Sequence, residues 1–248
     1  MKESTSRKPP AEEQHPRSNG ALEQLERDPS SRKRFLKVVG GAAAAGSLAT
    51  LLAACGEEEN ETAAPAQKAP GRPPTNQFGR GDIGILNYAL TLEHLEAEFY
   101  EEVVRSGEVT DRKLATLAKR IGENENEHVE ALTATVKQLG GTPAKKPKTN
   151  FRSVIEGGPK KILATAAVVE NVGAAAYLGQ AGNIKSDEVL AAALSIHTVE
   201  AEHAAALNEL AGNGFRKGGL EGSLPDGAFA KPMSVQQVLA QVKPFLAA

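Results

Sequence analysis

The connections between four long helical patterns place the strongest constraint on the fold of this chain. The patterns cover about 82–106, 110–139, 159–181 and 186–211. The first two patterns are separated by only a few residues, and so are the last two, so each pair must form an antiparallel hairpin. The remaining connection, 140–158, is long enough to run the length of a helix, because an extended chain spans about 3.3 Å per residue. The sequence therefore predicts an all-α four-helix bundle in which one long crossover joins two hairpins.

Residues suited to helix ends support these limits. Asp82, Thr110 and Ser186 are predicted N-caps, because their side-chain oxygens can accept hydrogen bonds from free backbone N–H groups. Pro159 suits the first turn of the third helix. Ser234 is predicted to begin a short C-terminal helix that packs on the bundle through an apolar stripe.

One carboxylate falls within an otherwise apolar stretch. Glu170 lies in AVVENVGAAAYLG (167–179), in the middle of the third helical pattern. An ionised carboxylate is costly to bury alone, so such a group is paired, protonated or bound to metal. The other acids and histidines of the chain should therefore show what accompanies Glu170.

Acids, tyrosines and histidines recur in matched order along the four patterns. The first and third patterns contain Glu-x6-Tyr, and the second and fourth contain Glu-x-x-His. The residues are Glu93 and Tyr100, Glu125 and His128, Glu170 and Tyr177, and Glu200 and His203. Spacings of three and seven put both members of a pair on one face of a helix. The order indicates two copies of one helical hairpin.

The four Glu residues are predicted to meet at mid-height, because they lie at nearly equal distances from their hairpin turns. One Glu from each of two helices, with Glu-x-x-His from each of the others, is the arrangement of a two-metal carboxylate site. Imidazole and carboxylate together suit iron or manganese. Four carboxylates also balance the charge of two divalent ions. We predict that two Fe or two Mn ions bind Glu93, Glu125, His128, Glu170, Glu200 and His203.

Several neighbouring residues have alternative interpretations. Glu96 competes with Glu93, but Glu93 is preferred because Glu96 does not match the level of Glu125 and its repeat counterpart is Gly173.

The roles of the other polar residues near the proposed ligands are less specific. Tyr100 and Tyr177 either act catalytically, by hydrogen bonds to ligands or intermediates, or pack in the core with satisfied hydroxyls. His197 is predicted to be a core or surface histidine, with contact to a metal ligand as the alternative, and Glu127 and Glu202 are predicted to be exposed.

Four stretches within about 82–210 carry a resemblance to a known family. They are LNYALTLEHLEAEFY, ENENEHV, VENVGAAAYLG and SIHTVEAEHAAAL. The chain resembles the bacterial ferritin-like domain family of the ferritin-like superfamily, which is related to desiccation-related proteins. The tail FAKPMSVQQVLAQVKPF also resembles the C-terminal segment of that family. The resemblance implies a ferritin-like four-helix bundle with a two-metal centre and leaves the reaction open.

The N-terminal part is typical of an export signal. SRKRFLK (31–37) resembles the twin-arginine motif, with Lys33 in place of the second Arg, and an apolar run follows it. LAAC (52–55) resembles a lipobox, in which Cys55 receives lipid. The alternative is an uncleaved N-terminal anchor.

The resulting organisation has four parts. They are a cytoplasmic tail and signal (1–54), a flexible tether (55–80), the bundle (81–212) and a docked C-terminal segment (213–248). We expect a lipoprotein on the outer face of the cytoplasmic membrane or in the periplasm. Cleavage before Cys55 would leave 29 − 9 = 20 basic and 31 − 6 = 25 acidic residues, a net charge of −5. No basic stripe with aromatics is present, so nucleic acid is excluded as a partner.

The expected function is redox chemistry of the oxidase, peroxidase or catalase type on oxygen or peroxide. The alternative is a metal-binding or stress-protective (desiccation) bundle without turnover. The sequence leaves open the choice of iron or manganese, the reductant and the oligomeric state, including a dimer.

Overall fold

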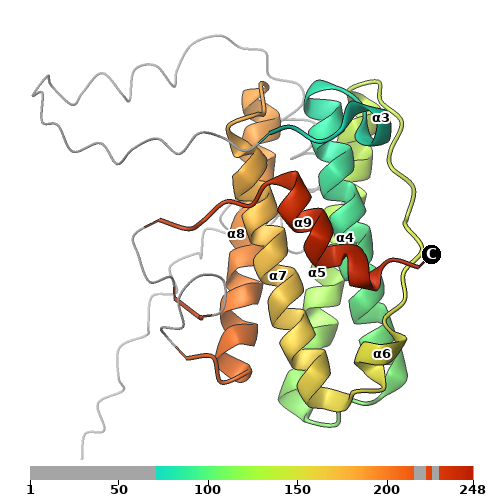
Figure 1. Cartoon of the computed structure of the whole chain (residues 1–248), viewed down its shortest axis with the longest axis vertical. Helices are drawn as coiled ribbons and strands as arrows, with labels where there is room; N and C mark the ends of the chain where they lie inside the picture. The colour runs from blue at the N-terminus through green and yellow to red at the C-terminus, as the bar shows by residue number, and fades with distance from the viewer. Residues whose placement is uncertain (1–70, 215–221, 225–228, 248) are drawn as a thin grey trace, which may run out of the picture. The chain divides into compact units, whose positions relative to one another are not determined.

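A computed structural model describes residues 71–214, 222–224 and 229–247 of the chain. Its four long helices are α4 (Gly81–Ser106), α5 (Arg112–Gln138), α7 (Gly158–Ala181) and α8 (Asp187–Leu210). They lie side by side, and the most extensive contacts join α4 to α5 and α7 to α8 (Figure 1). The described residues contain no strand, so the predicted all-α bundle of two hairpins is confirmed. Cys55, the predicted signal and most of the predicted tether lie outside the described residues.

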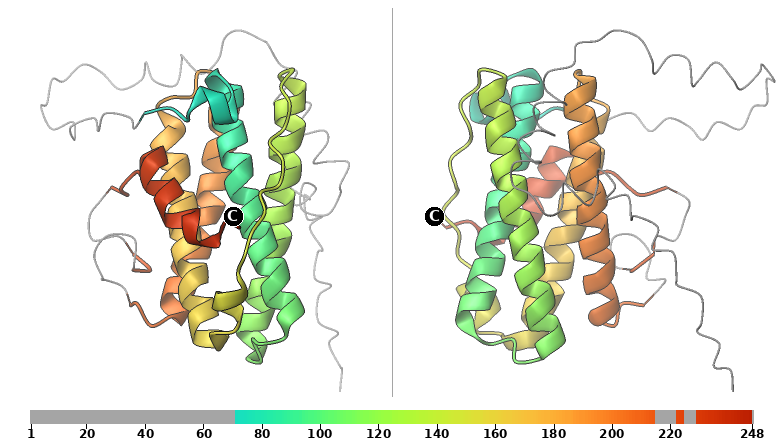
Figure 2. Two further views of the ribbon diagram at one scale, coloured as in Figure 1. Left: turned by 45° about the vertical axis from the view of Figure 1, so that its right-hand side comes forward. Right: turned by 180° about the vertical axis from the view of Figure 1, so that it is seen from behind.

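The crossover between α5 and α7 runs lengthwise along the bundle, as predicted (Figure 2). It includes the short helix α6 (Arg152–Ile155). Just before α6, the fully buried Phe151 packs against Phe99 of α4, with ring centroids 5.1 Å apart. Nearer α5, the side chain of Asn87 accepts a hydrogen bond from the N–H of Ala144. These contacts attach both ends of the crossover to α4.

Two of the predicted N-caps are confirmed. The hydroxyl of Ser186 accepts a hydrogen bond from the N–H of Val189, and that of Ser234 accepts one from Gln237 in a capping box. Pro159 lies in the first turn of α7, also as predicted.

The other two predicted caps are wrong. α5 is capped by the side chain of Asp111, one residue after Thr110. Asp82 lies inside the first turn of α4, where its carboxylate accepts hydrogen bonds from the N–H groups of Lys185 and Ser186. Asp82 therefore ties the start of α4 to the turn between α7 and α8. Its sequence neighbours gave no sign of this long-range partner.

α7 packs against α8, α4, α6 and α9. It is long and apolar enough to cross a membrane by length and composition, but 61% of the apolar window is buried inside the bundle. The short helices α3 (Thr75–Phe78) and α9 (Val235–Val242) complete the domain, and α9 packs on α7. Three valines of α9, at 235, 238 and 242, are buried, which confirms the predicted apolar stripe.

Small residues of α7 let the C-terminal segment lie directly on the helix backbone. The N–H of Met233 donates a hydrogen bond of 3.0 Å to the carbonyl of Ala175. A Cβ added at Gly179 would collide with the carbonyl oxygen of Met233. The absent side chain at Gly179 is therefore a condition for docking the segment before α9.

Gly179→Ala is expected to lower the free energy of unfolding by about 1–3 kcal/mol, because overpacking displaces the C-terminal segment. Chemical denaturation measures this change, and limited proteolysis should cut the variant first near Met233. Gly71→Ala is the control, since a Cβ there meets nothing within 4 Å. Equal stability of the two variants would contradict the proposed docking.

Candidate metal centre

The four Glu residues predicted as ligands come together inside the bundle, one from each long helix. All four are fully buried, and both predicted histidines are 8% exposed. Two groups of side chains place their ligand atoms within 4.8 Å of one another. The groups are Glu93, Glu125, His128 and Glu200, and Glu125, Glu170, Glu200 and His203. All six residues singled out in the sequence therefore belong to one cluster.

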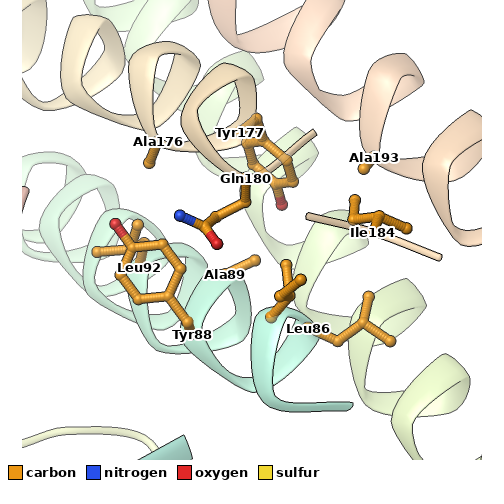
Figure 3. A pocket seen from close by; sticks show the side chains of 10 residues that line it. Leu86, Tyr88, Ala89, Leu92, Ala176, Tyr177, Gln180, Ile184 and Ala193 are labelled. Carbon is orange, nitrogen blue, oxygen red and sulfur yellow. The ribbon is translucent and has the colours of Figure 1, made fainter. Parts of the chain in front are cut away.

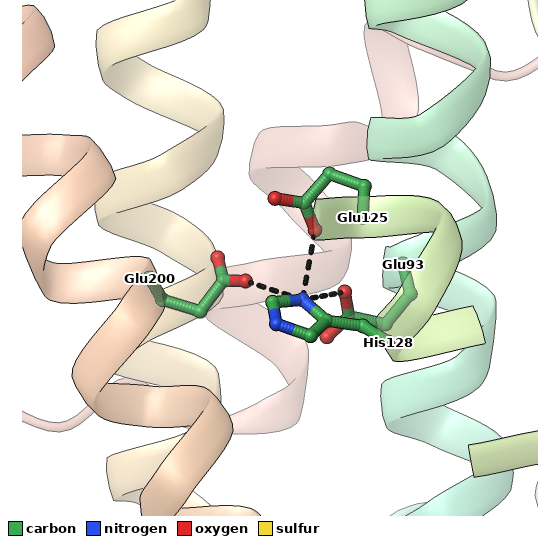
Figure 4. Close-up of side chains that lie close together, drawn as sticks. All are labelled: Glu93, Glu125, His128 and Glu200. Atoms are coloured by element: carbon green, nitrogen blue, oxygen red, sulfur yellow. Dashed lines mark hydrogen bonds and ion pairs between the residues drawn. The ribbon is translucent and has the colours of Figure 1, made fainter. Parts of the chain in front are cut away.

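In the first group, three carboxylates converge on a single imidazole nitrogen (Figure 4). Nδ1 of His128 lies 3.1 Å from Oε2 of Glu93, 3.1 Å from Oε2 of Glu125 and 3.3 Å from Oε1 of Glu200. An imidazole nitrogen carries at most one proton to donate. His128 therefore cannot satisfy three acceptors that come from three different helices.

The second group is centred on His203 of the other hairpin, where carboxylates from both hairpins approach one imidazole nitrogen. Nδ1 of His203 lies 3.1 Å from Oε1 of Glu125 and 3.1 Å from Oε2 of Glu170. Glu125 and Glu200 belong to both groups, whereas Glu93 and Glu170 each belong to one. The cluster thus has two shared and two outer carboxylates.

Asn124 helps to orient His203, a role that the sequence gave no reason to expect. Its side-chain amide lies 3.2 Å from Nε2 of His203. This contact occupies Nε2 and leaves Nδ1 facing the carboxylates. A partner on the outer ring nitrogen is the usual way to hold a histidine ligand.

The tyrosines of both Glu-x6-Tyr pairs reach across to the other hairpin. The hydroxyl of Tyr100 donates to Oε1 of Glu170 at 2.6 Å, and that of Tyr177 donates to Oε1 of Glu93 at 2.5 Å. Both tyrosines are buried. Burial, and then the charge of Glu170, raises the pKa of Tyr100. Burial, and then the charge of Glu93, raises the pKa of Tyr177. The rings are buried and both hydroxyls are satisfied by proposed ligands, which agrees with both interpretations, so a catalytic role of the tyrosines stays a prediction.

Burial and mutual repulsion change how the cluster holds protons. Burial, and then the charge of Glu170, raises the pKa of Glu125 to about 7. Burial and the charges of Glu125 and Glu93 raise the pKa of Glu200 well above its ordinary value. Burial also acts to lower the pKa of His203, but hydrogen bonds to Glu125 and Glu170 outweigh it and raise this pKa to about 9. Protons therefore supply part of the positive charge that the acids require.

The cluster nevertheless keeps unsatisfied oxygens. Oε1 of Glu125 and both carboxylate oxygens of Glu200 are buried without a hydrogen-bond partner, although histidine nitrogens lie near two of them. A buried polar atom without a partner costs free energy, and an unpaired carboxylate costs much more. These atoms belong to the two shared carboxylates, between the histidine groups. Buried oxygen and imidazole donors in this arrangement can hold metal ions.

A family model described as a ferritin-like domain matches residues 81–213. The chain belongs to the ferritin-like domain family. The matched segment contains α4, α5, α7 and α8, and with them the whole cluster of this ferritin-like bundle. A comparison with curated protein sequences gives no match.

Glu96 is a buried member of the ferritin-like core that the sequence analysis set aside. It is 3% exposed, and its Oε2 has no hydrogen-bond partner. Burial, followed by the charges of Glu200 and Glu93, raises its pKa well above the ordinary value. Gly173 is the repeat counterpart of Glu96 and carries no acid. A Cβ at Gly173 would lie 2.9 Å from Oε1 of Glu96 and 2.5 Å from Oε2 of Glu200, so the glycine instead leaves space for both carboxylates.

The remaining polar residues lie where the sequence analysis expected them. Glu127 and Glu202 are exposed. Nδ1 of His197 lies 3.0 Å from the carbonyl oxygen of Ala174, so this histidine links α8 to α7 and does not point at the cluster.

A small cavity borders the cluster at Tyr177 (Figure 3). Its volume is about 20 Å³, and its walls come mainly from aliphatic side chains such as Leu92 and Ala176. The amide of Gln180 also lines it but is already engaged by Gly71 and Asn183. The ring of Tyr177 faces this cavity, while its hydroxyl donates to Glu93.

The metal-free protein is expected to lose stability as the pH rises from about 5 to about 9. In the folded state Glu125 holds its proton up to a pKa of about 7 against an ordinary value of 4.5, and His203 up to about 9 against 6.5. The folded state then binds more protons than the unfolded state. Stability therefore falls by about 1.4 kcal/mol per pH unit for each such proton. The lowered pKa of Glu93 acts only below its ordinary value of 4.5, outside this range.

Chemical denaturation at several pH values tests this expectation. Bound metal should oppose the trend, because ligands bind metal in their deprotonated forms. A metal-free protein whose stability rises with pH over this range would contradict the description of the cluster.

Proposed function

We propose that this ferritin-like protein holds two Fe or two Mn ions and carries out redox chemistry on oxygen or peroxide. The single observation that carries the proposal is the pair of buried ligand groups that share Glu125 and Glu200. Glu125 and Glu200, which belong to both groups, would hold the ions together with Glu93 and Glu170. Two divalent ions would balance these four negative charges. They would also give partners to the carboxylate oxygens that have none.

The histidines and tyrosines would fix the orientation of the ligands. Nδ1 of His128 and Nδ1 of His203 face the carboxylates and would each bind an ion. The hydroxyls of Tyr100 and Tyr177 would hold the outer oxygens of Glu170 and Glu93. Hydrogen-bonded ligands of this kind are held in one orientation, which tunes the metal.

When bound in reduced form, two such ions would supply the electrons for chemistry on oxygen or peroxide. The chain contributes a buried site that excludes bulk water, because all four Glu side chains are inaccessible to solvent. The Tyr100 and Tyr177 hydroxyls are the nearest groups able to hold a proton beside the outer carboxylates.

Export is a separate part of the proposal, supported by SRKRFLK (31–37) and LAAC (52–55). Lipid on Cys55 would anchor the protein outside the cytoplasmic membrane, where it would meet external oxidants. Reducing equivalents would come from another molecule, unless the reaction is the dismutation of peroxide.

Glu170→Gln is expected to lower metal affinity by at least about tenfold while the fold is kept, because the amide has nearly the same shape but no charge. Metal analysis after dialysis and circular dichroism measure the two effects. Glu202→Gln is the matched control, since Glu202 is exposed on the neighbouring helix α8. Undiminished metal content in Glu170→Gln would remove Glu170 from the ligand set.

Addition of Fe²⁺ to the metal-free protein without oxygen should load two ions per chain. Exposure to air is then expected to raise the near-ultraviolet absorbance as the iron is oxidised, and a reductant should reverse the change. Bound iron that responds to neither oxygen nor peroxide would favour metal binding without turnover. A folded protein that takes up neither iron nor manganese would leave a stress-protective bundle.

A further inference from the structure

One buried carboxylate of the core is outside the set of six ligands. We propose that Glu96 is a seventh ligand of the metal pair, which closes the site on the side of Gly173. This inference rests on the proposed function, because it requires that the cluster binds metal. It adds a residue that neither the repeat in the sequence nor the two ligand groups contain.

A buried carboxyl oxygen without a hydrogen-bond partner is the first reason. Glu96 is 3% exposed, and its Oε2 accepts no hydrogen bond. A structural acid in a helical core would be expected to have a donor, because a buried carboxyl group without one is costly. The groups that act on Glu96 most strongly are themselves acids, first Glu200 and then Glu93. A cation at the cluster is the partner that these surroundings lack.

The position of the side chain is the second reason. Glu96 follows Glu93 by three residues, so it lies on the same face of α4, one turn farther along. A Cβ placed at Gly173 would have two side-chain oxygens as its nearest neighbours, Oε2 of Glu200 and Oε1 of Glu96. The two carboxylates therefore lie on the same side of Gly173. Glu96 thus reaches the space beside a shared carboxylate of the cluster.

The break in the repeat is the third reason. The two halves of the chain match at Glu93 and Glu170, but the position of Glu96 corresponds to Gly173. A side chain at Gly173 would occupy the space of the Glu96 carboxylate. The glycine at position 173 of α7 therefore leaves room for the additional acid at position 96 of α4. The two positions together make one side of the site richer in carboxylate than a symmetric repeat would.

Co²⁺ binding to the metal-free protein tests this assignment, because its visible spectrum reports the number and type of ligands. Glu96→Gln and Glu96→Asp are compared with the unchanged chain. We expect both variants to bind Co²⁺ at least about tenfold more weakly and with an altered spectrum. The amide removes the charge, and the aspartate keeps the charge but is one methylene shorter. Glu98→Gln is the matched control on the same helix, since Glu98 is paired with Lys146.

The outcomes separate this inference from the proposed function. Unchanged affinity and spectrum in Glu96→Gln, with two Co²⁺ ions still bound, would overturn the role of Glu96 and leave the six-ligand site intact. Full affinity and an unchanged spectrum in Glu96→Asp would show that only the charge of Glu96 matters, which also overturns ligation. An unchanged chain that takes up no Co²⁺ would overturn both. Thermal denaturation without metal confirms that each variant is folded.

Discussion

Carboxylates from four helices lie together in one buried space. Their mutual repulsion destabilises the fold unless positive charge lies among them. Glu93, Glu125, Glu170 and Glu200 are all fully buried. In the metal-free chain, His128 and His203 and retained protons supply the compensation. Oxygens of Glu125 and Glu200 still remain without hydrogen bonds. The packing of the rest of the bundle must offset the free energy that this burial costs.

This packing depends on where small residues occur in α7. Gly173 opens the inner face of this helix to two carboxylates, and Gly179 opens its outer face to the C-terminal segment. α7 can therefore pack closely against the cluster on one side and against the chain before α9 on the other. The apolar, glycine- and alanine-rich sequence of this helix serves both surfaces.

Much of the fold and the site could be predicted from the sequence. Both depend on the helical period of the residues and on the nearly equal distances of the four Glu residues from their hairpin turns. Helix-length patterns and connection lengths determined the two hairpins and the crossover. The Glu-x-x-His and Glu-x6-Tyr pairs identified all six cluster residues, because a three- or seven-residue spacing fixes a helix face. The role of Asp82 could not be predicted, because its partners lie a hundred residues away in the turn before α8. The burial of Glu96 beside the cluster was not predicted, because its level along α4 and its glycine counterpart in the repeat both favoured Glu93.

The cross-hairpin bonds of Tyr100 to Glu170 and of Tyr177 to Glu93 are equivalent under exchange of the two halves. Each hairpin thus donates one hydrogen bond from a tyrosine hydroxyl to the other hairpin and accepts one from it at a glutamate. A peptide with a single such hairpin would be complementary to its own copy and would complete the cluster as a symmetric pair. The equivalence ends at one pair of positions, because Glu96 of α4 corresponds to Gly173 of α7.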